Sequence, residues 1–207
     1  MRQGHAKSKG AKSRGGASIH GWMHPWPPPV WLITDERIPQ ADLFDAVRTL
    51  PRGSAIVLRH YTLAEAARRT LFERIRQIAR MRHCLILLAG DPETAHLWGA
   101  DGHHGRAPRS AVMSRAGRRW RHSAPVHDAD ELAVAIEAGA DAVLLSPLFA
   151  TRSHPGAPSL GPARFAALAR RAPIPIIALG GVRPRHSRLV RRLGAAGYAA
   201  IDGLSGR

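Results

Sequence analysis

A polar loop rich in glycine and proline follows an uninterrupted apolar run in the last third of the chain. Residues 142–145 show no alternation of apolar and polar side chains, which is typical of a parallel strand buried on both faces. The loop that follows offers hydroxyls, a guanidinium, an imidazole and glycine N–H groups, at Ser146, Thr151, Arg152, Ser153, His154, Gly156 and Gly161. Such groups bind anions, and phosphate suits them best. The loop therefore predicts either a phosphate site or an ordinary surface crossover.

Two further strand ends carry glycine. Gly180 and Gly181 follow the apolar run 174–179, and a later run, 198–201, leads into Asp202-Gly203. In α/β barrels the loops after the seventh and eighth strands frequently hold a phosphate through backbone N–H groups. We therefore expect these loops to lie beside the loop after residue 145 and to bind a phosphorylated ligand. The alternative is that the glycine pair only permits a tight turn.

Alternating strand and helix patterns would position these loops. The expected strands cover 30–35, 55–59, 84–89, 100–103, 124–127, 142–145, 174–179 and 198–201. The expected helices begin near residue 42 and then cover 63–82, 92–98, 130–138, 162–172 and 185–193. This succession favours a compact (β/α)8 TIM barrel of the α/β class. An open doubly wound sheet is the alternative, but Thr34 to Arg37 stand where its glycine-rich fingerprint would follow the first strand.

Composition limits the partners. The chain has 207 residues, enough for one domain, and a formal net charge of +16, which favours anionic partners such as phosphorylated metabolites. An arginine-rich composition can also follow from codon usage alone. Cys84 is the single cysteine and is predicted to be a buried thiol. A chain with one cysteine cannot form an intrachain disulfide. No apolar run reaches the roughly 18 residues of a membrane span, and no signal-peptide core is present, so a cytoplasmic protein with no membrane partner is expected.

The N-terminal part differs from the rest of the chain. Residues 1–22 carry basic side chains among Gly, Ser and Ala, and a proline-rich segment follows. We expect 1–29 to form a disordered lead-in whose tryptophans pack on the domain, and 30–207 to form the barrel. A basic tail is compatible with nucleic-acid binding, but the chain has neither a recognised binding motif nor an aromatic stacking run, so nucleic acid is not favoured as a partner.

Short motifs at the expected strand ends occur in a characteristic order. They lie at Trp31–Asp35, Leu58-Arg59, Gly90-Asp91, Ala100–His104, Val126-His127, Ser146–Gly156, Leu160-Gly161, Ala178–Val182 and Gly197–Ile201. In this order they resemble the thiamine phosphate synthase/TenI family over nearly the whole domain. The SPLFATRSHPG segment followed by ALGGV is the most specific part of the resemblance.

The resemblance implies a transferase of thiamine biosynthesis, a thiamine-phosphate diphosphorylase. Such enzymes join hydroxymethylpyrimidine diphosphate to thiazole phosphate and expel diphosphate. The diphosphate is expected to leave first, and the thiazole nitrogen then captures the pyrimidine cation. This chemistry needs Mg²⁺ and cationic groups to stabilise the departing diphosphate. The implied partners are phosphorylated small molecules, and a homo-oligomer is left open.

The resemblance also implies roles for individual residues. Arg59 would contact the diphosphate, and Asp91 would ligate Mg²⁺. Ser153 and His154 would lie in the catalytic phosphate-gripping loop. The other implied phosphate-binding residues are Thr151, Arg152, Gly161, Gly180, Gly181, Ile201 and Asp202.

Several positions depart from the family pattern. The strand end Gln-x-Arg-x-Lys appears as residues 57–61, Val-Leu-Arg-His-Tyr, and keeps only its arginine. Gly90 replaces an asparagine, His154 replaces a lysine, and 106–109 contain no second magnesium carboxylate. The alternative is therefore a phosphate-binding relative, either a sensor or a tautomerase-like protein with His154 or His127 as its base.

Histidines and carboxylates raise the question of a metal site. His103, His104 and His127 are close in sequence to expected strand ends, but adjacent strand residues point to opposite faces, so at most one of the first two faces into the barrel. A histidine metal site is therefore not favoured. Asp35 and Asp101 are the carboxylates that could join Asp91.

Overall fold

A computed structural model describes residues 26–107, 120–151, 158–201 and 204. The strands are β1 (Val30–Ile33), β2 (Ala55–Leu58), β3 (Leu85–Ala89), β4 (Gly102–His104), β5 (Arg121–Val126), β6 (Ala142–Leu145), β7 (Ile176–Ala178) and β8 (Gly197–Ala200). The helices are α1 (Gln40–Thr49), α2 (Glu65–Met81), α3 (Pro92–Leu97), α4 (Ala129–Glu137), α5 (Gly161–Arg171), the 3₁₀ turn η2 (Pro184–His186) and α6 (Ser187–Arg192). Residues 1–25 of the expected lead-in 1–29 lie outside the described residues.

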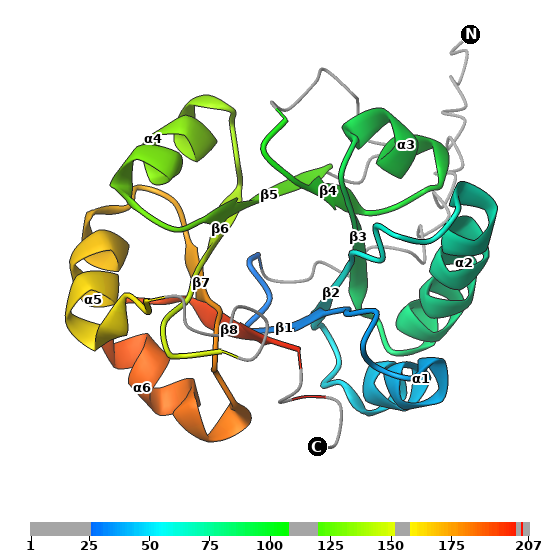
Figure 1. Cartoon of the computed structure of the whole chain (residues 1–207), viewed down its shortest axis with the longest axis horizontal. Coiled ribbons are helices and arrows are strands. Elements are labelled where there is room, and N and C mark those ends of the chain that lie inside the picture. The colour runs from blue at the N-terminus through cyan, green and yellow to red at the C-terminus, as the bar shows by residue number, and fades with distance from the viewer. Residues whose placement is uncertain (1–25, 108–119, 152–157, 202–203, 205–207) are drawn as a thin grey trace, which may run out of the picture.

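The eight strands form one closed parallel barrel in sequence order. Each strand pairs with its neighbours, and β8 closes the sheet on β1 with Val30 opposite Tyr198. The helices surround the strands as an outer ring (Figure 1). The predicted (β/α)8 barrel is therefore confirmed, and the open doubly wound sheet is excluded.

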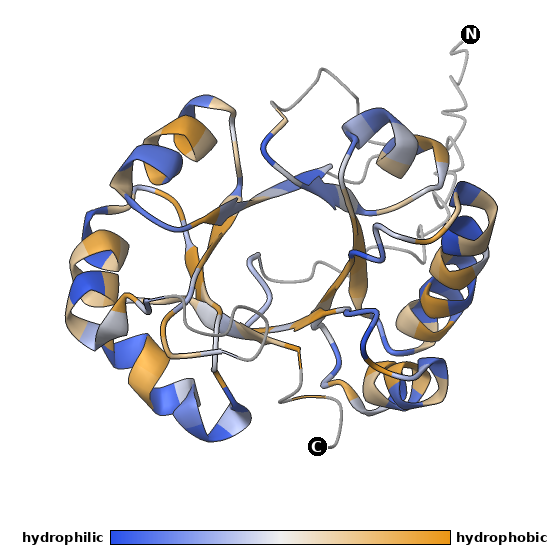
Figure 2. Cartoon of the chain, in the orientation of Figure 1, coloured by the Kyte–Doolittle hydropathy of each residue, from blue (hydrophilic) through white to orange (hydrophobic). Residues whose placement is uncertain are grey.

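Apolar side chains fill both faces of the strands, as the lack of alternation predicted. One cluster fills the barrel interior, with Trp31, Ile33, Val57, Leu87, Leu144, Ile177 and Ala199 among its members. Two more clusters lie between the strands and the helices, around Phe72 and around Phe165. Figure 2 shows the matching pattern, with apolar helix surfaces turned toward the barrel.

Most elements differ from the predicted ranges by a few residues, and the starts of β5 and β7 have a clear reason. β5 begins at Arg121, three residues before the expected 124, because Gly102 of β4 pairs with Arg121. β7 begins at Ile176 rather than at 174, since Pro175 has no N–H to donate and only its carbonyl joins the ladder, accepting from Val143 N at 3.0 Å. Both differences arise from pairing between strands.

Trp26 covers the end of the barrel at which the strands begin. Its ring packs against the interior cluster and lies edge-on to Trp31, with centroids 5.6 Å apart. Its indole N–H donates to the carbonyl of Asp141 at 3.1 Å, and the Arg121 guanidinium lies 4.7 Å from its ring. The expectation that a lead-in tryptophan packs on the domain is therefore confirmed for Trp26.

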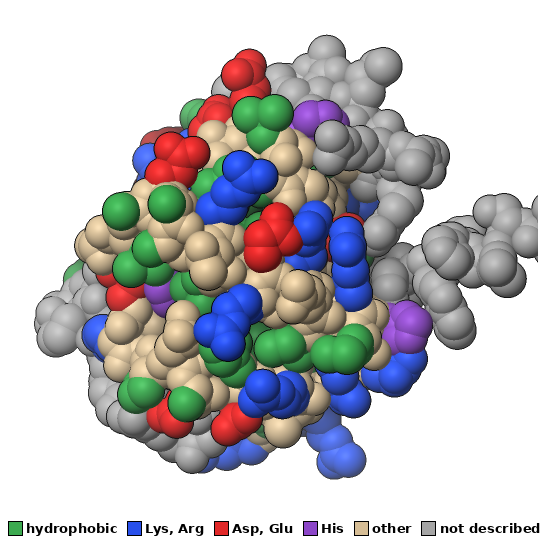
Figure 3. Space-filling model, turned by 90° about the vertical axis from the view of Figure 1, so that its right-hand side faces the viewer, with side chains coloured by type: hydrophobic (Ala, Val, Ile, Leu, Met, Phe, Trp, Pro, Cys, Tyr) green, Lys and Arg blue, Asp and Glu red, His purple; other side chains and the backbone are tan. Residues whose placement is uncertain are grey.

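Positive charge is not spread evenly around the helical ring. On the face that carries α1 and α2, basic and acidic side chains lie side by side (Figure 3), and Arg76 pairs with Glu73. Residues 142–201 contain no acidic residue at all. Their exposed arginines are Arg164, Arg170, Arg171, Arg183, Arg185, Arg188, Arg191 and Arg192. The excess positive charge therefore lies on the side of the barrel that carries α5 and α6. Within the described residues, no helix has the length and apolar character needed to cross a bilayer.

Candidate functional site

The barrel mouth is the end formed by the carboxyl ends of the parallel strands and the loops that follow them. The loops after β6 and β7 join there through backbone hydrogen bonds. Leu148 N donates to Leu179 O at 2.8 Å, and Phe149 N donates to Gly180 O at 3.0 Å. Two of the predicted phosphate-binding segments therefore lie side by side, as expected.

The glycine pair is required by this close approach. Gly180 and Gly181 both have positive φ, +91° and +64°. A Cβ on Gly181 would lie 2.6 Å from the carbonyl oxygen of Ala150, directly before Thr151. Neither glycine N–H donates to a residue that the structure describes; Gly181 is exposed and Gly180 is buried.

The other predicted phosphate-binding residues have different surroundings. Gly161 has φ +66°, but its N–H donates to Leu148 O at 3.1 Å and so stabilises the loop itself. Ile201 follows β8 and packs partly against the barrel interior. Arg152, Ser153, His154 and Asp202 lie outside the described residues.

Arg59 projects into the barrel mouth. Ala55 and Val57 of the same strand face the barrel interior, and the alternation of a strand directs Arg59 to the same side. The side chain is half-buried. The pKa of Asp35 is lowered mainly by its hydrogen bond with Arg37 and that of His104 mainly by burial, and the charge of Arg59 adds to both shifts. The residue predicted to contact diphosphate therefore lies among polar groups of the mouth.

Thr34 holds the strand end that carries Arg59. Its buried hydroxyl accepts a hydrogen bond from Arg59 N at 3.0 Å and lies 2.9 Å from His60 Nδ1. His60 is buried and has φ +40°, a conformation that a non-glycine residue seldom adopts. Burial lowers the pKa of His60. The β1 and β2 ends therefore act as one hydrogen-bonded unit.

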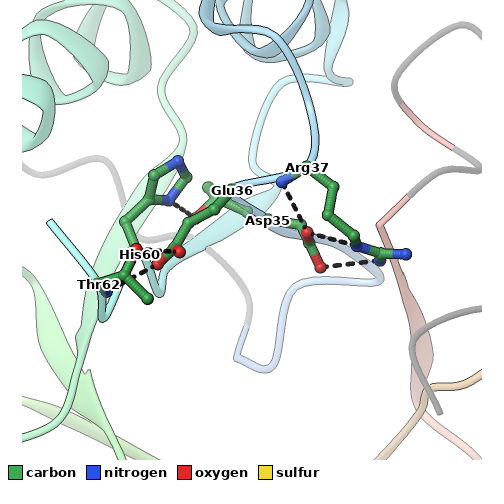
Figure 4. Close-up of polar contacts among 6 residues, drawn as sticks. Asp35, Glu36, Arg37, His60 and Thr62 are labelled. Carbon is green, nitrogen blue, oxygen red and sulfur yellow. Dashed lines mark hydrogen bonds and ion pairs between the residues drawn. The ribbon is translucent and has the colours of Figure 1, made fainter.

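The carboxylates after β1 are already paired. Arg37 forms a fork with Asp35, with N–O distances of 2.8 and 2.9 Å, and these bonds hold the pKa of Asp35 below its usual value (Figure 4). Glu36 accepts from both the backbone N–H and the hydroxyl of Thr62, which lowers its pKa. Neither carboxylate is an uncommitted metal ligand.

Asp91, the predicted magnesium ligand, is the N-cap of α3. Its Oδ2 accepts from Thr94 N at 2.7 Å and from Thr94 Oγ1 at 2.8 Å. These bonds lower the pKa of Asp91, and they satisfy a donor in the first turn of the helix. The preceding residue, Gly90, has φ +116° and contributes no ligand atom from a side chain.

Asp101 cannot join Asp91 in a metal site. It precedes β4 and accepts from Ile86 N at 2.9 Å, near the start of β3 and so at the opposite end of the barrel. Asp141 makes the equivalent bond to His122 N before β6. No group of three or more possible His, Cys, Asp or Glu ligands occurs among the described residues. The described carboxylates therefore do not gather into a Mg²⁺ site made of protein ligands alone.

His104 is a mouth residue that the sequence interpretation did not assign to the site. It is paired in register with Ala89 of the interior cluster, whereas His103 is paired with Leu88, which packs against the helices. The two histidines therefore face opposite sides, as predicted. His104 Nδ1 lies 3.0 Å from Ser123 Oγ, and burial, followed by the charge of Arg59, lowers the pKa of His104 to about 3. The alternation of inward and outward side chains along β3 and β4, considered together, could have identified this residue from the sequence.

His127 has a carboxylate partner that sequence proximity did not reveal. Its Nδ1 lies 2.7 Å from Glu131 Oε2 on α4, and Arg106 pairs with the other oxygen of Glu131. Asp128, the neighbour in sequence, instead caps α4 by accepting from Glu131 N at 2.8 Å. The side chain of His127 is half exposed, so the pair is accessible from solvent.

Comparisons with known proteins agree with this arrangement. A family described as thiamine monophosphate synthase matches residues 30–204. The thiamine-phosphate synthase of Alcanivorax borkumensis is 29% identical over 185 residues, covering 86% of this chain and 85% of that protein, and the enzyme of Lysinibacillus sphaericus is 30% identical over 148 residues, 70% of each. The structure of thiamine phosphate pyrophosphorylase from Pyrococcus furiosus has a TM-score of 0.69 at 21% identity, covering 87% of this chain and 88% of that one. With its closed barrel and its match from residue 30 to residue 204, the chain belongs to the thiamine monophosphate synthase family.

Proposed function

We propose that the protein is a thiamine-phosphate synthase that condenses hydroxymethylpyrimidine diphosphate with thiazole phosphate. Family membership supports a synthase of thiamine biosynthesis. The observation that supports the specific reaction is that two separate groups suited to binding anions lie at the mouth. Arg59 lies after β2, and the N–H groups of Gly180 and Gly181 lie after β7, with β1 and β8 between them. Two phosphorylated substrates need two such sites.

The proposed reaction requires no proton transfer. The bond between the pyrimidine methylene carbon and the diphosphate oxygen breaks, and its electron pair leaves with diphosphate. The lone pair of the thiazole nitrogen then forms the new carbon–nitrogen bond. Arg59 is the group proposed to stabilise the developing charge on diphosphate. His104 is neutral near pH 7, because its pKa is about 3, and so adds no charge to the mouth.

The direct test is formation of thiamine phosphate and diphosphate by the full-length protein supplied with both substrates. Arg59→Met is expected to lower kcat by about a hundredfold, because one charge-stabilising group is lost. Arg52→Met is the matched control, since Arg52 is exposed on the turn before β2, at the opposite end of that strand. If the two variants had equal activity, Arg59 would have no part in the reaction.

A tautomerase-like activity is the second candidate, favoured by the contact between His127 and Glu131. A carboxylate on Nδ1 orients an imidazole and leaves Nε2 able to accept a proton from carbon. The test is isomerisation of a thiazole carboxylate phosphate by the wild type and by Glu131→Gln. Turnover that falls with this variant supports the second candidate. Binding of thiazole phosphate with no turnover in either assay supports a sensor.

A further inference from the structure

Arg68 of α2 connects the carboxyl ends of β2 and β3. Its Nε donates to the carbonyl oxygen of Arg59 at 2.9 Å, and its Nη2 donates to the carbonyl oxygen of Ala89 at 2.6 Å. The rings of Tyr61 and Trp98 lie 5.5 and 5.9 Å from the guanidinium carbon. These contacts hold a half-buried positive charge at the mouth, beside the backbone of Arg59.

Four carboxylates described at the mouth already have partners within the protein. Asp35 is held by Arg37, Glu36 by Thr62, Asp91 by Thr94, and Glu131 by His127 and Arg106. Asp35, Glu36 and Glu131 use both carboxylate oxygens in these contacts, whereas Asp91 uses Oδ2 alone. Mg²⁺ takes one or two carboxylates together with substrate phosphates, and these four groups leave it at most one oxygen, Asp91 Oδ1.

We propose that Arg59 and Arg68 neutralise the diphosphate of the substrate at the ends of β2 and β3, in place of a divalent cation held by carboxylates. Arg59 binds the diphosphate directly, and Arg68 is a positioning residue that fixes the Arg59 backbone and adds its own charge. A guanidinium binds phosphate oxygens through two parallel N–H groups, which suits this task. The inference rests on the proposed function, since it concerns the diphosphate of that reaction.

The test measures binding of inorganic pyrophosphate to the full-length protein by calorimetry, first in excess EDTA and then in excess MgCl₂. We expect the dissociation constants to agree within about threefold, because charge-assisted hydrogen bonds carry the affinity. In EDTA, Arg59→Met and Arg68→Met should each weaken binding about tenfold, and Arg68→Lys should recover part of this loss because it keeps the charge without the fork.

Arg76→Met is the matched control for Arg68→Met. Arg76 is also a partly buried arginine of α2 that donates to a backbone carbonyl, Trp98 O at 3.2 Å, but it contacts neither strand end among the described residues. Its loss should lower the melting temperature without changing pyrophosphate affinity. Parallel assays of synthase activity in EDTA separate this inference from the proposed function.

The outcomes are distinct. Pyrophosphate binding that appears only with Mg²⁺ overturns the inference, and so does an Arg76→Met variant that loses as much affinity as Arg68→Met. Binding in EDTA that depends on both mouth arginines supports it. If the protein binds pyrophosphate in this way but forms no thiamine phosphate under any condition, the proposed function fails while the anion site stands.

Discussion

His103 accepts a hydrogen bond from the indole N–H of Trp120, with 3.2 Å between Nδ1 and Nε1. Because an indole nitrogen can only donate, this bond requires His103 to be neutral with its proton on Nε2, which lies 3.4 Å from Ala107 O. The ring also stacks on the buried ring of His122, with centroids 4.1 Å apart. Burial and the charge of His122 lower the pKa of His103 to about 4. The strand pair β4–β5 therefore depends on neutral imidazoles.

Mild acid should destabilise the protein before its carboxylates titrate. In the unfolded chain His103 and His104 have pKa values near 6.5, whereas in the fold these are about 4 and about 3, so the unfolded state binds more protons. The contribution of the two neutral histidines to the free energy of unfolding is complete above about pH 6.5. As the pH falls below this value, it is lost by about 1 kcal/mol per pH unit for each histidine. Urea denaturation between pH 6.5 and 5 measures this slope. His103→Asn should reduce it by about half, and an unchanged slope in this variant would contradict the assignment.

Replacing Gly181 with alanine should destabilise the barrel more than replacing Gly161. Both residues have φ near +65°, which costs an alanine about 1–2 kcal/mol. A Cβ on Gly161 meets nothing within 4 Å, whereas one on Gly181 meets Ala150 O at 2.6 Å and Phe149 Cβ at 2.8 Å. Gly181→Ala is therefore expected to lose about 3 kcal/mol or more, measured by chemical denaturation. If both variants lost the same free energy of unfolding, the loops after β6 and β7 would not be in close contact.

Asp91 can be tested as a helix cap separately from any role with metal. Asp91→Ala should lower the free energy of unfolding by about 1 kcal/mol, because Thr94 N loses its acceptor. Asp91→Ser keeps a capping oxygen but removes the charge, so its stability should match that of the wild type. If Asp91→Ser is stable and binds pyrophosphate as the wild type does in EDTA but more weakly than the wild type in MgCl₂, Asp91 contributes to a metal site after all.

Thr34→Val should affect both stability and the position of Arg59. The substitution leaves Arg59 N and His60 Nδ1 without their common partner in a buried setting, at an expected cost of about 1–3 kcal/mol. Thr34→Ser, which keeps the hydroxyl, is the control and should retain most of the stability. Thermal denaturation of both variants checks the expectation, and a valine variant as stable as the wild type would show that these bonds contribute little.

The sequence by itself determined the barrel and the order of its loops. Fully apolar runs marked strands buried on both faces, and amphipathic runs such as 65–81 marked helices with one buried side. The glycine pair at 180 and 181 was predicted to lie beside the loop after β6, and it does. These features follow from local periodicity and from the rule that parallel strands end on the same side, so neighbouring residues in sequence suffice to predict them.

Only the tertiary structure decided which charged groups meet. Asp91 caps its own helix, Asp101 bonds at the opposite end of the barrel, and Glu131 rather than Asp128 pairs with His127. Arg68 reaches two strand ends from a helix that periodicity described only as amphipathic. A carboxylate or guanidinium has several candidate partners in a sequence of this composition. The choice depends on strand register, helix placement and the length of each side chain, which local patterns do not encode.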